Sequence, residues 1–232
     1  GFTCLPLTNG GILWYDPSGL NGADNSYYSA GRLVFGEGCV DDGEDGDVIW
    51  HELGHGLHDW ITGGSLSQVN GLSEGSGDYW AQSNSRSLNQ WTSSDAAYHW
   101  MFNWDGHNTC WGGRTTNYAP IYPGGLVNQI HTDGQIWATC LLNVWEDIGQ
   151  QAMDKIFLEG LGNTNGSASQ NDAANAVYQA ALDLGYNASQ LTDVHTGLTS
   201  CGYTLPALVL PGVTAEFTST SNTAIEGNGC GT

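Results

Sequence analysis

The stretch of sequence that decides the fold is DVIWHELGHGLHDWIT, residues 47–62. Its apolar residues recur at the spacing of a helix face, and Gly63 and Gly64 follow at its end, so this stretch predicts one helix. His51 and His55 are four residues apart within it. In a helix this spacing separates two side chains by about 40° around the axis and about 6 Å along it. Both imidazoles can therefore reach one metal ion, and Glu52 can contact water at that ion.

A catalytic zinc ion needs a third protein ligand and keeps one position open for water. His58 is not suitable, because a helix would place it about 10 Å from His51 along the axis. The metzincin pattern is also excluded. It requires Gly at position 58 and His at position 61, where this chain has His58 and Ile61.

Glu74 is the remaining candidate for the third ligand. It lies in LSEGSGD, residues 72–78, which is expected to open the next helix, and Asp78 falls one turn later on the same face. We therefore predict that zinc binds to His51, His55 and Glu74. Glu52 is the predicted catalytic base, and Asp78 is predicted to hold the far nitrogen of His51 and fix its tautomer.

The remaining periodicity predicts an α+β fold. Three further helices are expected over residues 72–84, 131–149 and 171–184, and two strands over residues 11–15 and 32–35. We expect a β-rich N-terminal subdomain with the HExxH helix over residues 1–64, a mainly α-helical subdomain over 65–204 and an extended tail over 205–232.

The chain is strongly acidic. Its 24 Asp and Glu residues stand against 4 Lys and Arg, for a net charge of -20. Such a charge repels phosphate backbones and anionic lipids, so nucleic acids and membrane surfaces are not expected as partners. Solubility and adaptation to salty water both explain the charge. No apolar run approaches the ~20 residues that a membrane-spanning helix needs.

Six cysteines form an even set without a CxxC pair, a pattern typical of disulfide bonds in an exported protein rather than of a zinc ribbon. The simplest expectation is a sequential pairing: Cys4 with Cys39, Cys110 with Cys140, and Cys201 with Cys230. Since the chain begins at Gly1 without an initiator Met, we also expect that a signal or pro-segment has been removed.

The segment from His51 to Asp78 resembles the gluzincin metallopeptidases, the thermolysin-like enzymes broadly and the fungalysin family in particular. Their pattern is HExxH followed by a ligand Glu within a Glu-x-x-x-Asp segment, which Glu74 and Asp78 match here. Similar blocks cover residues 25 to about 148. The resemblance implies the gluzincin fold, with an active-site cleft between the two subdomains. It also implies a secreted monomer made as a zymogen with a cleaved propeptide.

Three other stretches carry roles that the resemblance implies. Residues 129–138, QIHTDGQIWA, are similar to the family segment whose His stabilises the transition state, which implies that role for His131; a helix N-terminal His without chemistry is the alternative. Residues 25–28 and 34–38 resemble the edge strand that binds the substrate backbone. Substrate contacts are thereby implied for Asn25 and Ser26. The family's substrate-binding Arg has one local candidate, Arg114, for which a structural ion pair is the alternative.

Calcium is a second candidate cofactor. Asp47 matches a calcium ligand of the thermolysin branch, but Ser85 replaces the expected partner acid, which argues against the double calcium site of that branch. Carboxylates clustered over residues 41–47 can bind Ca²⁺, although they lack the spacing of an EF-hand loop. A solvated acidic loop is the alternative.

Together these features predict a secreted zinc metalloendopeptidase that hydrolyses protein or peptide substrates with zinc-activated water and Glu52 as general base. A catalytically inactive zinc-binding protein is one alternative, and the intact Glu52 argues against it. A secreted adhesion or carbohydrate-binding module is another, suggested by 10 Trp residues. Several of these lie on the apolar faces of predicted helices and are better explained as core: Trp50, Trp60, Trp137 and Trp145.

Overall fold

The computed structural model describes residues 13–210, which form a mixed α+β structure. Its α-helices are α2 (Gly46–Ile61), α3 (Leu72–Ser87), α4 (Ile130–Ile148), α5 (Gln150–Leu161), α6 (Gln170–Asp183) and α7 (Ala188–Ser200). Its strands are β1 (Trp14–Asp16), β2 (Tyr27–Ser29), β3 (Arg32–Val34), β4 (Trp100–Met101) and β5 (Arg114–Thr115). Short 3₁₀ segments are η1 (Asp42–Glu44), η2 (Val69–Gly71) and η3 (Ala96–His99).

The four predicted helices are all present as α2, α3, α4 and α6, with ends within three residues of those expected. Helix α2 begins where the sequence provides a cap, because the side chain of Asp45 accepts a hydrogen bond from the backbone N–H of Asp47 at 2.7 Å. Helices α5 and α7 were not predicted. Gly149, with φ 84°, separates α4 from α5 without any polar loop that would mark a new helix.

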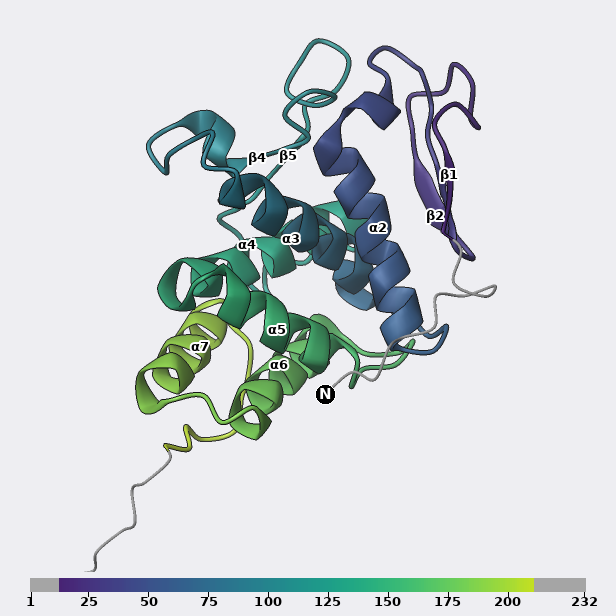
Figure 1. Ribbon diagram of the computed structural model, residues 1–232. Coiled ribbons are helices and arrows are strands. Elements are labelled where there is room, and N and C mark those ends of the chain that lie inside the picture. The colour runs from purple at the N-terminus through teal and green to yellow at the C-terminus, as the bar shows by residue number, and fades with distance from the viewer. Residues whose placement is uncertain (1–12, 211–232) are drawn as a thin grey trace, which may run out of the picture.

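A small sheet lies on one side of α2 and the other helices lie on its opposite side (Figure 1). The strand order is β1-β3-β2, with β1 parallel and β2 antiparallel to β3. The strand predicted over residues 32–35 is β3, and the one predicted over 11–15 is β1, although residues 11 and 12 lie outside the described part. Within residues 13–210, β2 pairs only with β3 and is thus an edge strand.

Helix α3 is the centre of the packing, because its most extensive contacts are with α2 on one side and α4 on the other. Glycines allow both approaches. A Cβ on Gly54 of α2 would lie 2.7 Å from Cα of Gly77, and a Cβ on Gly75 would lie 2.3 Å from the carbonyl oxygen of Gly134 in α4. The three helices are therefore close enough to bring side chains from each of them to one place.

Two apolar clusters support this arrangement. The larger lies among α3 to α7, and the smaller joins the sheet, α2 and the β4 region. Trp60 and Trp137 are buried and Trp50 and Trp145 are half-buried, so the prediction that these four belong to the core is confirmed. The predicted boundary after residue 64 falls between α2 and η2, and the division into subdomains stays a prediction.

The predicted order of the disulfide bonds is wrong. Cys39 is bonded to Cys110 and Cys140 to Cys201. Tertiary packing decides these pairs, since α4 packs against α7 and brings Cys140 to the residue that ends α7. Cys4 and Cys230 lie outside the described residues, but their predicted partners are already bonded elsewhere.

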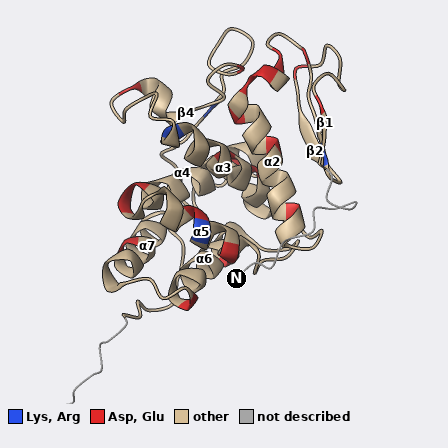
Figure 2. Cartoon of the chain, viewed as in Figure 1, with Lys and Arg blue, Asp and Glu red and all other residues tan. Residues whose placement is uncertain are grey.

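Acidic residues are spread over the chain and gather on the loop that leads into α2 (Figure 2). Two of the four basic residues are held in ion pairs, Arg86 with Glu146 and Arg114 with Asp78, each at 2.7 Å. Among residues 13–210, no helix combines the length and the apolar character that crossing a bilayer requires.

Candidate metal centre

A cleft of about 790 Å³ opens along α2 and is bounded by the β2 edge, α3, the loop before β5 and the start of α4. All the predicted site residues except Asp78 line it: Asn25, Ser26, His51, Glu52, His55, Glu74, Arg114 and His131. Asp78 is fully buried behind this lining. The structure thus brings together residues from five separate segments of the chain.

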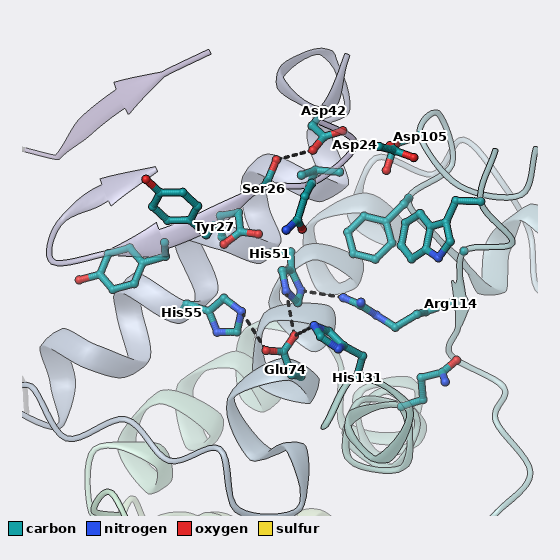
Figure 3. A pocket seen from close by; sticks show the side chains of 18 of the residues that line it. Asp24, Ser26, Tyr27, Asp42, His51, His55, Glu74, Asp105, Arg114 and His131 are labelled. Atoms are coloured by element: carbon teal, nitrogen blue, oxygen red, sulfur yellow. Dashed lines mark hydrogen bonds and ion pairs between the residues drawn. The ribbon is translucent and has the colours of Figure 1, made fainter. Parts of the chain in front are cut away.

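Three side chains in this cleft form a group that fits one metal ion (Figure 3). Nε2 of His51 lies 3.5 Å from Oε2 of Glu74, and Nε2 of His55 lies 3.7 Å from Oε1 of Glu74. Tetrahedral ligands with bonds of about 2.1 Å are separated by about 3.4 Å, close to these distances. Among the described residues, no fourth His, Cys, Asp or Glu atom joins the group, whose atoms all lie within 4.8 Å of one another.

Each of these three side chains is oriented by a neighbour. Nδ1 of His51 lies 2.8 Å from Oδ1 of Asp78, and Nδ1 of His55 lies 2.8 Å from Oγ of Ser73. The amide of Gln68 donates to Oε1 of Glu74 at 2.8 Å. With Nδ1 of both rings engaged, Nε2 of each is left to face the metal position. The sequence argument anticipated Asp78 but missed Ser73 and Gln68, which no motif marks.

Asp78 binds two partners at once. Arg114 donates to both of its oxygens, through Nε at 2.9 Å and Nη2 at 2.7 Å. The β4–β5 pairing positions this arginine opposite Met101. Burial alone would raise the pKa of Asp78, but Arg114 and His51 hold that pKa below its usual value. The ion pair suggested as the alternative for Arg114 is therefore present, and a substrate-binding role stays a prediction.

The buried histidines differ in charge state when no metal is bound. Burial lowers the pKa of His51, but its contacts with Asp78 and Glu74 outweigh this effect and raise that pKa to about 9. Burial and the neighbouring His51 lower the pKa of His55 to about 4. A metal ion would thus have to displace the proton from His51. His58, rejected above as a ligand, lies outside the group; burial lowers its pKa to about 3, so it stays neutral.

Glu52 lies in the cleft beside these ligands with an incomplete set of hydrogen bonds. Only 6% of its surface is exposed, and its Oε2 has no hydrogen-bond partner among the described residues. Burial raises the pKa of Glu52 to about 7. A carboxylate with a pKa in this range can both accept and release a proton near neutral pH.

His131 lies in the first turn of α4, with 50% of its side chain exposed. Its Nε2 is 3.4 Å from Oε2 of Glu74, and its Nδ1 is 3.0 Å from the amide nitrogen of Gln129. It is not a member of the compact ligand group. This side chain therefore stands at the rim of the metal position, with one nitrogen directed toward it (Figure 3).

Asn25 and Ser26 immediately precede the edge strand β2 and face the cleft. The hydroxyl of Ser26 donates to Oδ2 of Asp42 at 2.6 Å, whereas Asn25 is exposed. Their predicted contacts with substrate stay predictions.

A second group of carboxylates lies in the same cleft: Asp24, Asp42 and Asp105. Burial and the charges of the surrounding aspartates raise the pKa of Asp105 to about 7. Asp42, Asp45 and Asp47 are all buried, at 2%, 3% and 7% exposure, so a solvated loop does not describe them. Sequence reasoning missed Asp24 and Asp105 because both are distant in sequence from the acidic stretch over residues 41–47.

A scan against models of known protein families finds no match to this chain, and a search among curated proteins finds none either. The resemblance to gluzincins therefore stays a prediction from the sequence motif.

Proposed function

We propose that this chain is a zinc-dependent endopeptidase with a gluzincin-type active site of the fungalysin kind. One observation carries the proposal: His51, His55 and Glu74 present two nitrogens and one carboxylate to a single point in an open cleft, with Glu52 next to them. A structural zinc site would normally be closed by four protein ligands. Three ligands at an accessible position favour catalysis instead.

Zinc suits this set of donors, because imidazole nitrogen and carboxylate oxygen are its usual ligands in hydrolytic sites. A zinc ion held there would supply Lewis acidity that polarises a peptide carbonyl and lowers the pKa of water from about 15.7 toward about 7. Asp78 contributes by fixing the Nδ1–H tautomer of His51.

The proton transfers belong to Glu52. Its carboxylate accepts a proton from the attacking water and then donates it to the leaving amine. Burial keeps this carboxylate out of bulk solvent, so the proton is not lost between the two steps. His131 donates from Nε2 to the oxyanion that develops on the scissile carbonyl, consistent with its position on the rim beside Glu74.

The substrate class is an extended peptide. Within residues 13–210, strand β2 has a free edge beside the cleft, and an extended chain can add to such an edge through its main-chain hydrogen bonds. Asn25 and Ser26 stand at the start of this edge, where they would contact the backbone of the bound peptide. Two disulfide bonds in the described part support export to an oxidising compartment. We further propose that the enzyme is made as a precursor with a propeptide, and that the mature form is a monomer.

Removal and restoration of the metal test the proposal. Treatment with ortho-phenanthroline should abolish cleavage of a quenched fluorescent peptide library, and one equivalent of Zn²⁺ should restore it. The matched control is meta-phenanthroline, which does not chelate zinc and should leave the activity intact. Full activity in protein verified to be metal-free would contradict the proposal, and so would zinc binding without any peptide hydrolysis.

A further inference from the structure

Three loops that are far apart in the sequence meet beside the start of α2. One precedes β2 and carries Asp24, the second is η1 with Asp42, and the third follows β4 and carries Asp105. The helix start holds the third loop in place, because Oδ2 of Asp45 accepts hydrogen bonds from the backbone N–H groups of Trp104 and Asp105 at 3.0 and 2.8 Å. The disulfide bond between Cys39 and Cys110 joins the same two regions.

Two of the carboxylates that meet there, those of Asp42 and Asp105, are buried without a full set of partners. Asp105 is only 7% exposed, yet no group within residues 13–210 donates a hydrogen bond to its carboxylate or forms an ion pair with it. Asp42 is 2% exposed; its Oδ2 accepts from Ser26, and its Oδ1 has no partner among the described residues. The carboxylate of Asp42 extends from Ser26 on one side toward Asp24 and Asp105 on the other (Figure 3).

No basic side chain of the described part offsets the negative charge of these three aspartates. No Lys or Arg of the described part forms an ion pair with any of the three aspartates, and Arg114, the basic residue in the same cleft, is bonded to Asp78. Burying unpaired carboxylates close together is costly unless a cation offsets their charge. A cation from outside the chain would supply the missing charge.

The geometry and the donor atoms identify the class of that cation. One oxygen from each aspartate lies within 4.8 Å of the other two, and two oxygens bound to one Ca²⁺ at 2.3–2.6 Å can be up to about 5 Å apart. All three donors are carboxylate oxygens, which suit hard cations and are a poor match for zinc without nitrogen or sulfur ligands. We propose that Asp24, Asp42 and Asp105 bind one calcium ion, with water and backbone oxygens completing its coordination.

This site differs from the acidic-loop site considered from the sequence, because only Asp42 belongs to that loop. Asp45 and Asp47 have their carboxylates engaged by backbone N–H groups of residues 102–105. The ion would connect the three loops that form one wall of the cleft. The bound calcium ion would stabilise that wall of the cleft. This inference does not depend on the proposed peptidase activity.

Calorimetric titration tests the site directly. Protein freed of all metals and then reloaded with one equivalent of Zn²⁺ is titrated with CaCl₂, and its melting temperature is measured with and without Ca²⁺. We expect one Ca²⁺ per chain and a higher melting temperature on binding. Asp24→Asn should weaken Ca²⁺ affinity by at least about tenfold, because one of three charged ligands is lost. Asp24 is exposed, so this variant should fold normally.

Glu44→Gln is the matched control. Glu44 lies in η1 two residues after Asp42, is exposed, and is not a member of the group. Its removal should change Ca²⁺ affinity by less than about twofold, since it alters only the general charge. Asp42→Asn, which keeps an acceptor for Ser26, should match Asp24→Asn. The proposal would be overturned if about 10 mM Ca²⁺ produced neither a heat of binding nor a change in melting temperature. This concentration lies above the dissociation constants usual for protein calcium sites. Equal weakening by Glu44→Gln and Asp24→Asn would also overturn it, because it would indicate diffuse attraction only.

Discussion

Gly77 of α3 lies directly against the imidazole of His51: a Cβ on this glycine would be 2.7 Å from Nδ1 of His51. The same nitrogen contacts Asp78, the next residue along α3. The ring is therefore held between the backbone of one residue and the carboxylate of its neighbour. The orientation of this metal ligand depends on the absence of a single methyl group.

Gly77→Ala should lower both stability and zinc affinity. The gain of about 1 kcal/mol in helix propensity is opposed by an overpacking cost of about 1–3 kcal/mol, and the displaced ring should weaken zinc binding by at least about tenfold. Urea denaturation and zinc titration measure the two effects. Gly46→Ala in α2 is the control, because a Cβ there meets nothing within 4 Å. Wild-type zinc affinity in Gly77→Ala would show that the ring is not constrained in this way.

Glu52→Gln should keep the metal and lose nearly all turnover, because a neutral amide cannot take a proton from water. Metal analysis should find one zinc per chain in the variant and in the wild type. The peptide assay should show a loss of about two to four orders of magnitude in kcat. Glu44→Gln, on an exposed residue of η1, controls for the loss of one charge. Turnover at the wild-type level would require a different base.

His131→Ala should reduce kcat and kcat/KM together by about two to three orders of magnitude, because the proposed contact forms mainly in the transition state. Zinc content should not change, since His131 is outside the compact ligand group. A lower melting temperature with normal specific activity of the folded fraction would indicate a structural role instead. Loss of zinc would indicate that His131 is a fourth ligand.

The sequence was informative where the chemistry is local. Helix α2 follows from its periodicity and from the two glycines that end it, Gly63 and Gly64, and the pairing of His51 with His55 follows from helical spacing alone. Glu74 was chosen as the remaining candidate on the next expected helix, and that helix packs against α2. Of the residues that orient these ligands, Asp78 was predicted. Gln68 was harder to predict, because it lies in an irregular segment before η2.

Contacts between distant segments could not be read from the sequence. The pairing of Cys39 with Cys110 depends on how the loop after β4 is tied to the start of α2. The approach of Asp105 to Asp42 has the same origin. Helix α7 was missed because only three of its residues are buried, Leu191, Val194 and Leu198. Its apolar stripe is too short to stand out from its polar surroundings.

The stability of the metal-free protein should depend on pH through Asp105. Burial, Asp42, Asp24 and Asp45 raise the pKa of Asp105 to about 7, from about 3.9 in an unfolded chain. Because the folded state holds this proton more tightly, its stabilising contribution is complete below about pH 4 and is lost as pH rises through about 7. The melting temperature of the calcium-free protein should therefore fall less between about pH 5 and 8 in Asp105→Asn than in the wild type.

Asp147→Asn is the control for this pH series. Asp147 is an exposed acid on α4, away from the group of aspartates. This variant should follow the wild-type pH dependence, since it leaves Asp105 and its neighbours unchanged. Identical slopes for Asp105→Asn and the wild type would show that Asp105 does not titrate in this range.

Peptide mapping of the unreduced protein should find Cys39 linked to Cys110 and Cys140 linked to Cys201. No free thiol is expected, given an even number of cysteines and the proposed export of the chain. Replacing Cys140 and Cys201 together by Ser should lower the free energy of unfolding by about 4 kcal/mol in the chain-entropy account, because this bond spans 61 residues. Two or more alkylatable thiols in the native protein would contradict the assignment.

Helix α3, with the sequence LSEGSGDYWAQSNSRS, is a weak helix former that carries Glu74 and Asp78. Each of its two glycines costs about 1 kcal/mol relative to Ala, and its 16 residues only just exceed the ~12–15 below which an isolated helix is marginal in water even with better residues. It persists because α2 and α4 enclose it. Inactivation by heat should then coincide with global melting, with no earlier stage in which the scaffold survives without its site. An ion bound by ligands from both α2 and α3 would cross-link the two helices. Metal binding would then be the last step of folding.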